Sequence, residues 1–165
     1  MSLLNKFKCT DPESGEQLVK LYFWFLVDEY GFTYYDKYNF RSKKMLIQVL
    51  PGHKTPRIDI SKIGEPDPDL FKLEFEWIIN FFHSTFPSDH RDYLKHKLED
   101  NMIFISKIFR ENSRKIINDF DSWWIPAHVS YYRTIEKQYR DEGQLERFRK
   151  SYRYYYEYLK GKDAI

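Results

Sequence analysis

The sequence predicts an α+β fold in which an N-terminal helix and a three-stranded antiparallel β-meander precede a helical C-terminal two-thirds with one long helix. Two observations predict this fold. Residues 45–50 and 57–61 alternate between a more apolar and a more polar set, which is the period of a β-strand. In most of the remaining chain, apolar residues recur every three or four positions, which is the period of a helix that buries one side.

The chain length of 165 residues fits one domain with a single core. Aromatic residues make up 19% of the chain, enough to offset the conformational entropy that folding costs. We therefore expect a single domain over residues 1–165, composed of a loose arm (1–10), a helix plus meander (11–62) and a helical part (67–160).

The predicted meander occupies residues 32–61. Phe32–Tyr38 is rich in aromatic residues and forms the expected first strand, before the strands at 45–50 and 57–61. Pro51–Thr55 connects the last two strands and contains two strong turn formers. Since a sheet this small needs a cover, we expect the helices to pack against it.

Helix-start residues precede the predicted helices. The first helix starts near Asp11–Ser14, where a capping side chain and a proline suit a first turn, and ends before Gly31. Asp67–Pro68 repeats this start for a helix that lies across the sheet. Ser88 is the expected N-cap of the long helix, which continues to about residue 120.

The C-terminal part is expected to contain further helices. Asp119–Pro126 interrupts the helical pattern and is interpreted as a connection, with the proline opening the next helix. Asp141–Gly143 predicts a turn, and the alternative is a glycine tolerated inside a longer helix. In the last helix, apolar side chains recur at steps of three and four and form a seam suited to packing on another helix. These side chains are Leu145, Phe148, Tyr152, Tyr155 and Leu159.

Composition excludes several classes of function. The net charge of +2 is too small to indicate a nucleic-acid partner by itself. Cys9 is the only cysteine, which excludes an intramolecular disulfide and a cysteine-based zinc site. The first residues lack the pattern of a signal peptide, and no apolar run approaches the length of a membrane span. We expect a cytoplasmic protein that does not bind membranes.

No residue pattern predicts catalysis or a cofactor. His90 and His96 point to different sides of a helix, so they cannot share a metal ion. The chain has neither a Gly-x-Ser-x-Gly motif nor a glycine-rich phosphate loop. A carboxylate pair such as Glu74 with Glu76 could act in acid–base chemistry, but nothing else indicates an active site. We therefore expect a non-enzymatic protein with no catalytic, metal-binding or cofactor-binding residues.

The expected connection at Asp119–Pro126 contains the candidate partner-binding residues. Large aromatic side chains in a loop are typical of protein interfaces, where they fill a pocket of the partner. Asp121, Trp123 and Trp124 are therefore the candidates for contact with another protein. The competing interpretation, which we favour for the indoles, is that one or both of them cover the end of the core.

A basic, tyrosine-rich tail predicts an alternative function, nucleic-acid binding. Rings interleaved with cations bind single-stranded nucleic acids through stacking and phosphate contacts. Because Tyr152 and Tyr155 belong to the apolar seam, few rings remain for stacking, and a solvated basic face on a docked helix is the competing interpretation. The candidate nucleic-acid-binding residues are Arg147, Arg149, Lys150, Arg153 and Tyr154.

Residues 18–62 carry a family resemblance. A helix ending in Val27–Phe32, the segment Phe40–Val49, a short turn and Arg57–Ile60 follow one another. This order resembles that of small uncharacterised bacterial proteins, some of which are similar to immunity proteins of polymorphic-toxin systems. The resemblance implies a non-enzymatic binder of another protein, which neutralises a cognate toxin. Its motifs are structural, and the long helices and tyrosine-rich tail after residue 84 have no counterpart in it, so no functional residue is carried over.

Overall fold

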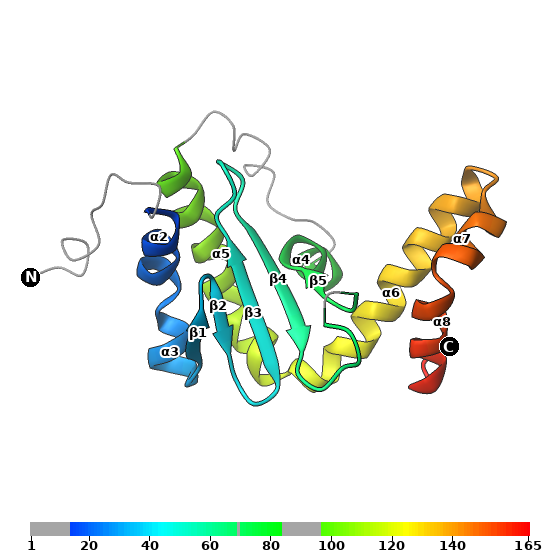
Figure 1. The fold of residues 1–165 in the computed structure, drawn as a ribbon, viewed down its shortest axis with the longest axis horizontal. Coiled ribbons are helices and arrows are strands. Elements are labelled where there is room, and N and C mark those ends of the chain that lie inside the picture. Colours follow the sequence, from blue (N-terminus) through cyan, green and yellow to red (C-terminus); the bar gives the residue numbers. More distant parts are fainter. Residues whose placement is uncertain (1–13, 69, 84–96) are drawn as a thin grey trace, which may run out of the picture.

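A computed structural model describes residues 14–68, 70–83 and 97–165 (Figure 1). The described chain combines helices with one antiparallel sheet, which confirms the predicted α+β class. The sheet has five strands in the order β1-β2-β3-β4-β5, so each strand pairs with its neighbours in the sequence. The strands are β1 (Thr33–Asp36), β2 (Asn39–Arg41), β3 (Met45–Leu50), β4 (Arg57–Lys62) and β5 (Leu73–Glu74).

The prediction of three strands is wrong, since the sheet has two more. The expected first strand ends at Asp36, and the chain reverses at Tyr38, whose φ of 69° is a left-handed turn conformation. It returns as β2, in which Phe40 pairs with Tyr34 of β1. The other additional strand, β5, pairs Leu73 with Ile60. Two residues are too few to show an alternating pattern in the sequence.

The helices form two groups. Figure 1 shows α2, α3, α4 and α5 around the sheet, whereas α6 leads away from it to α7 and α8. The helices are α2 (Ser14–Phe23), α3 (Phe25–Tyr30), α4 (Phe75–His83), α5 (Leu98–Asn118), α6 (Phe120–Asp141), α7 (Leu145–Ser151) and α8 (Arg153–Gly161). None of these described helices has the length and apolar character needed to cross a membrane.

Several helix boundaries differ from the prediction. The first helix is divided at Trp24 into α2 and α3, and it ends at Gly31 as expected, with φ at 70°. The start at Asp67–Pro68 is wrong, because α4 begins only at Phe75. Phe71 and Leu73 are buried in different clusters, and Leu73 belongs to β5, so no helix runs through these residues. The proposed caps at residues 11–13 and at Ser88 lie outside the described residues, and the side chain of Ser14 lies outside the described side chains.

Helix α6 corrects the predicted connection at Asp119–Pro126. The helix begins at Phe120, and Pro126 lies inside it. A proline cannot donate the hydrogen bond that would reach the carbonyl of Ser122. Ser122 is exposed, so water can satisfy that carbonyl, while the buried Trp123 and Trp124 hold the first turns of the helix on the core. Tertiary burial therefore outweighs the local effect of the proline.

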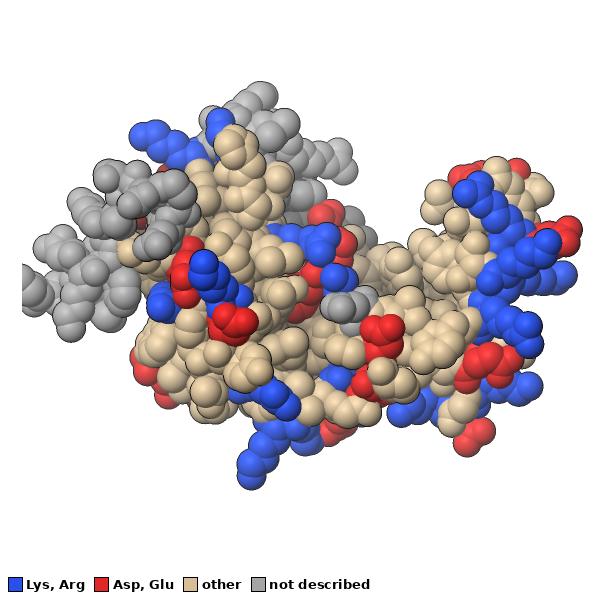
Figure 2. All heavy atoms as spheres, in the orientation of Figure 1, with Lys and Arg blue, Asp and Glu red and all other residues tan. Residues whose placement is uncertain are grey.

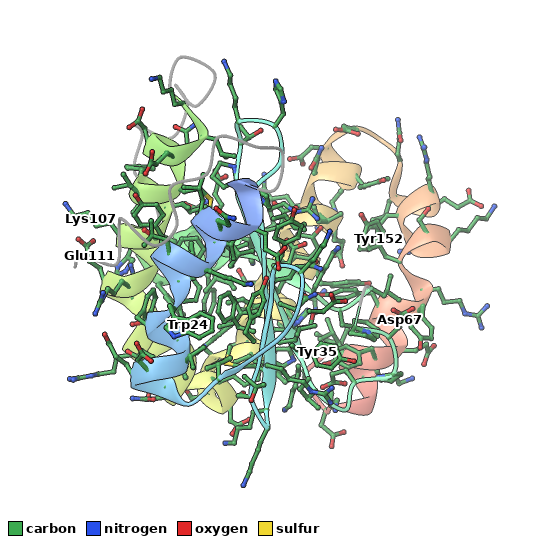
Figure 3. All side chains as sticks on the ribbon, turned by 60° about the vertical axis from the view of Figure 1, so that its left-hand side comes forward. Trp24, Tyr35, Asp67, Lys107, Glu111 and Tyr152 are labelled. Atoms are coloured by element: carbon green, nitrogen blue, oxygen red, sulfur yellow. The ribbon has the colours of Figure 1, made fainter. Side chains whose placement is uncertain are left out.

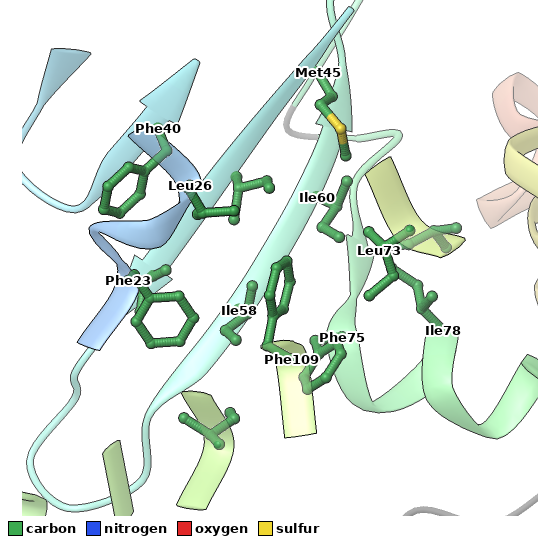
Figure 4. Packing of buried hydrophobic residues seen from close by; sticks show 14 of the residues in the cluster. Phe23, Leu26, Phe40, Met45, Ile58, Ile60, Leu73, Phe75, Ile78 and Phe109 are labelled. Carbon is green, nitrogen blue, oxygen red and sulfur yellow. The ribbon is translucent and has the colours of Figure 1, made fainter. Parts of the chain in front are cut away.

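The main hydrophobic core lies between the sheet and α2–α5, with the start of α6 (Figure 4). Met45, Ile47 and Val49 of β3 are buried, whereas the residues between them are partly exposed, which confirms the predicted alternation. Figure 4 shows the aromatic and aliphatic side chains that meet this face of the sheet. They include Phe23, Leu26, Phe40, Ile58, Ile60, Leu73, Phe75, Ile78 and Phe109.

A second cluster, here called the C-terminal cluster, joins α6, α7 and α8. Its buried members are Phe71, Tyr132, Phe148, Tyr155 and Leu159. Leu145 and Tyr152 pack against them while partly exposed, so the predicted apolar seam is confirmed. The chain reverses between α6 and α7 at Gly143, with φ at 70°, which confirms the expected turn.

Candidate partner-binding surface

One face of the sheet carries no helix in the described part of the chain. Figure 3 shows Tyr35 on one side of the sheet and Lys107 and Glu111 of α5 on the other. We call this side the open face; the segment that follows β4 covers part of it, since Ser61 is buried and donates to the Pro68 carbonyl at 3.2 Å. Strand alternation, together with the lining of a shallow hollow in this face, identifies its side chains. They are Tyr35, Asn39, Arg41, Leu46, Gln48, Arg57, Asp59, Ser61 and Glu74.

Strand pairing arranges four polar side chains of the open face in one row. Asn39 of β2 is opposite Gln48 of β3, which is opposite Asp59 of β4, and Asp59 is opposite Glu74 of β5. Facing residues on neighbouring strands lie close enough for their side chains to interact. The row therefore forms a continuous strip of hydrogen-bonding groups across four strands.

Asp59 is the most buried member of this polar row, with 2% of its surface exposed. The guanidinium of Arg57 donates a hydrogen bond of 2.8 Å to its Oδ2, and the ammonium of Lys72 lies 3.4 Å from the same oxygen. The other oxygen, Oδ1, is buried and has no hydrogen bond among the described residues. A buried carboxylate is tolerated when cations compensate it, and here two cations share one oxygen.

Asn39 contributes a second unpaired acceptor to the polar row. Its amide nitrogen donates to the Lys37 carbonyl at 3.0 Å, whereas its buried Oδ1 accepts no hydrogen bond within the described chain. A buried acceptor without a donor costs about 1–3 kcal/mol. Asn39 Oδ1 and Asp59 Oδ1 are therefore two unpaired acceptors beneath the surface of the open face, where a partner docked on that face does not reach them.

A shallow hollow of about 390 Å³ lies beside the polar row. Tyr35 is 66% exposed there, and the guanidinium of Arg41 lies 5.7 Å from the centroid of its ring, a cation–π distance. Glu65 closes the other side and is 3.5 Å from Lys162 of the C-terminal end. Figure 2 shows acidic and basic atoms side by side over the β4 and β5 region. Exposed aromatic and arginine side chains are enriched at protein interfaces.

The structure separates the three partner-binding residues predicted from the sequence. Trp123 and Trp124 are 4% and 0% exposed and lie in a helix, so the favoured interpretation, burial, is confirmed for both indoles. Trp123 donates from its indole nitrogen to the Ile116 carbonyl at 3.0 Å. The indoles are inaccessible in this fold, because a partner contact needs surface that they do not have.

Asp121 is exposed and joins the start of α6 to the sheet. Its carboxylate accepts a hydrogen bond from Lys44, and Lys62 of β4 lies 3.8 Å away. The hydrogen bond from Lys44 is the main reason that the pKa of Asp121 is below its ordinary value, and desolvation opposes it. These contacts give Asp121 a structural role at the end of the sheet.

The five residues proposed for nucleic-acid binding point in different directions. Arg147 donates to Gln144 at 3.3 Å, and Lys150 lies 3.5 Å from Glu146, both along α7. Tyr154 packs on Phe71, with ring centroids 5.6 Å apart. The remaining two, Arg149 and Arg153, line a groove against α6. The described side chains do not form one continuous stacking platform, and nucleic-acid binding stays a prediction.

Two of the described histidines, His128 and His83, each have a side chain as hydrogen-bond partner. His128 is fully buried, and its Nδ1 shares a hydrogen bond with the hydroxyl of Tyr155. Burial lowers the pKa of His128 to about 3, so the ring is neutral at physiological pH. His83 lies 2.8 Å from the Asn112 amide oxygen. No group of three or more His, Cys, Asp or Glu side chains in the described ranges could hold a metal ion. Cys9, His90 and His96 lie outside those ranges.

Sequence reasoning did not identify the polar row as a site. The alternation at 45–50 and 57–61 indicated that each strand has a more polar face. It did not indicate which polar residues are neighbours, because register depends on the pairing of strands. The polar faces of β3 and β4 were therefore recognisable in the sequence. Asn39 and Glu74 were not, because they belong to β2 and β5, the two strands that were not predicted.

The fold and this surface define a class of protein, an α+β domain with an antiparallel sheet open on one face. No family model matches the chain, and neither a curated protein nor a solved structure matches it significantly.

Proposed function

We propose that the protein is a non-enzymatic protein-binding domain and that the open face of its sheet contacts the partner. The observation that supports this function is the pair of Tyr35, which is 66% exposed, and Arg41, whose guanidinium lies 5.7 Å from the Tyr35 ring centroid, beside a shallow hollow on this face. Exposed aromatic and arginine side chains are enriched at protein interfaces, where they fill pockets of the partner. The shallow form of the adjoining hollow suits a protein surface better than an enclosed small molecule.

The chemistry of the polar row specifies the partner's side of the contact. Gln48 lies between the two unpaired acceptors, and Glu74 at the end of the row is 56% exposed in its side chain. Carboxylate and amide oxygens accept hydrogen bonds from arginine, lysine and backbone N–H groups. The partner's contacting surface therefore presents mainly donors, with an acidic group opposite Arg41.

The resemblance to immunity proteins supports the class of partner. It covers residues 18–62, which include strands β1 to β4 and most of the open face. We therefore propose that the partner is a toxin encoded beside this protein and that binding inactivates the toxin. Steric cover of the toxin's active surface would be sufficient, since no catalytic group is required of the binder.

The test uses the product of the neighbouring reading frame, made catalytically inactive, in a calorimetric titration. We expect a complex of micromolar affinity or tighter. The variant Gln48→Lys places a cation in the polar row, so donors of the partner are repelled and affinity falls about tenfold, or 1.4 kcal/mol. The control Glu111→Gln makes the same charge change on α5, on the opposite side of the sheet, and leaves affinity unchanged (Figure 3).

Two results would overturn this proposal. One is the absence of a complex with either neighbouring product at micromolar concentration. The other is a complex in which Gln48→Lys binds as tightly as the wild type, because the open face would then lie outside the interface. Growth rescue supplies an independent readout, since co-expression with the active toxin should protect cells in proportion to the measured affinity.

A further inference from the structure

A groove of about 440 Å³ runs between α6 and the pair α7 and α8, away from the open face. Its floor contains Leu145 and the buried Phe148, and Tyr156 on its wall is 39% exposed. Lys and Arg atoms gather over α7 and α8 in Figure 2, at the right of the view. The groove lining therefore combines apolar side chains with three arginines and two glutamates.

Two arginines of this groove, Arg149 and Arg153, line it from α7 and α8. Arg149 and Arg153 make no hydrogen bond or ion pair in the part of the chain that the structure describes. Arg149 lies near the end of α7 and Arg153 at the start of α8, on either side of Tyr152, and both line the groove. Two guanidinium groups spaced in this way can bind one or two carboxylates in the bidentate geometry that arginine favours.

The acidic side chains in the groove are partly compensated already. Glu136 lies 2.7 Å from Arg140 and 3.2 Å from Arg133, so both of its oxygens are paired. Glu157 also lines the groove and faces the same space as Arg153. The closely spaced phosphates of a nucleic-acid backbone would be repelled by these two carboxylates. A short peptide segment with isolated carboxylates can instead contact the arginines alone.

We propose that this groove binds an acidic peptide segment of a partner protein. Arg149 and Arg153 pair with its carboxylates, and an adjacent apolar side chain rests on Leu145, Phe148 and Tyr156. The volume accommodates a few side chains, within the range of specific binding pockets. Charge complementarity and the apolar floor together select this ligand, and the inference stands whether or not the open face binds a toxin.

The probe is a fluorescein-labelled hexapeptide of alternating glutamate and phenylalanine, followed by fluorescence anisotropy with the full chain. We expect saturable binding that weakens as salt is added. The double variant Arg149→Gln and Arg153→Gln should weaken binding about tenfold or more. The matched control, Arg147→Gln with Lys150→Gln, removes the same charge from the other side of α7 and should change affinity by about twofold or less. Thermal unfolding of both variants verifies that the fold is intact.

A second probe identifies the chemistry of the ligand. A peptide with glutamine in place of glutamate should bind at least about tenfold more weakly than the acidic peptide. Equal binding of the two peptides, or an equal loss in the control variant, would overturn the proposal. It would also be overturned if a labelled oligothymidine bound more tightly than the acidic peptide and lost affinity in the Arg149 and Arg153 variant. The same holds if the acidic peptide does not bind at millimolar concentration.

Discussion

The rings of Phe71 and Tyr158 are stacked, with centroids 4.0 Å apart and planes inclined by 22°. Phe71 comes from the connection between β4 and β5 and is 1% exposed, whereas Tyr158 belongs to α8. This contact joins the sheet to the C-terminal helices through a single side chain. The C-terminal cluster is therefore held by α6 and also by the connection that precedes β5.

Replacement of Phe71 by alanine should loosen the C-terminal helices selectively. We expect a loss of about 3–5 kcal/mol of unfolding free energy, typical of a buried phenylalanine. Hydrogen exchange should accelerate in α7 and α8 more than in β3 and β4. The neighbouring variant Leu70→Ala is the control, since Leu70 is 45% exposed and should cost about 0.5 kcal/mol or less. Unchanged exchange in α8 would contradict this coupling.

The ion pairs of Asp59 should respond asymmetrically to substitution. Arg57 and Lys72 keep 46% and 33% of their side-chain surface exposed, so water can solvate them after Asp59→Asn, and we expect a modest loss of stability. The double variant Arg57→Gln and Lys72→Gln leaves the buried carboxylate uncompensated and should cost about 3–5 kcal/mol. Urea denaturation at pH 7 measures both. A larger cost for Asp59→Asn would refute the asymmetry.

His128 should make the fold sensitive to acid. Burial lowers its pKa from 6.5 to about 3, so below pH 6.5 the unfolded chain binds a proton on this ring that the folded chain does not. Its contribution to stability is complete above pH 6.5 and is lost as the pH falls towards 3, by up to about 1.4 kcal/mol per pH unit. His128→Gln cannot titrate. Its unfolding free energy should therefore decline less steeply between pH 6 and 4, and parallel curves would disprove this.

Gly52 should be intolerant of a side chain. Its φ is +58°, and an added Cβ would lie 2.8 Å from the Thr55 carbonyl oxygen in the turn between β3 and β4. We expect Gly52→Ala to destabilise the protein by about 1–3 kcal/mol. At Gly161, where nothing lies within 4 Å of an added Cβ, alanine should be neutral or slightly stabilising. Equal melting temperatures for the two variants would contradict the prediction.

Features that depend on neighbouring residues were predictable from the sequence. The buried face of β3, the left-handed helix end at Gly31, the turn at Gly143 and the apolar seam of residues 145–159 were all confirmed, although the predicted last helix is divided at Tyr152 into α7 and α8. In each case a local rule operates: strand alternation, the conformational freedom of glycine, or the helical repeat. Such rules need only residues that are close in the chain.

Features that depend on distant packing were not predictable. The helix continues through Pro126 because Trp123 and Trp124 are buried against the core. Phe71 interrupts the expected helix because it belongs to the C-terminal cluster, which is made largely of residues that come much later in the chain. Local propensity favoured the wrong assignment in both places, and tertiary contacts decided the outcome.

The sequence by itself determined the α+β class, the apolar faces of its strands and helices, and most of the points at which the chain turns. Only the tertiary structure decided that Asn39 and Asp59 share a row on the open face, and that Arg149 and Arg153 face a groove on α6. The physical reason is that strand register and helix docking are fixed by the combined packing of residues far apart in the chain. Both candidate binding surfaces are products of that packing.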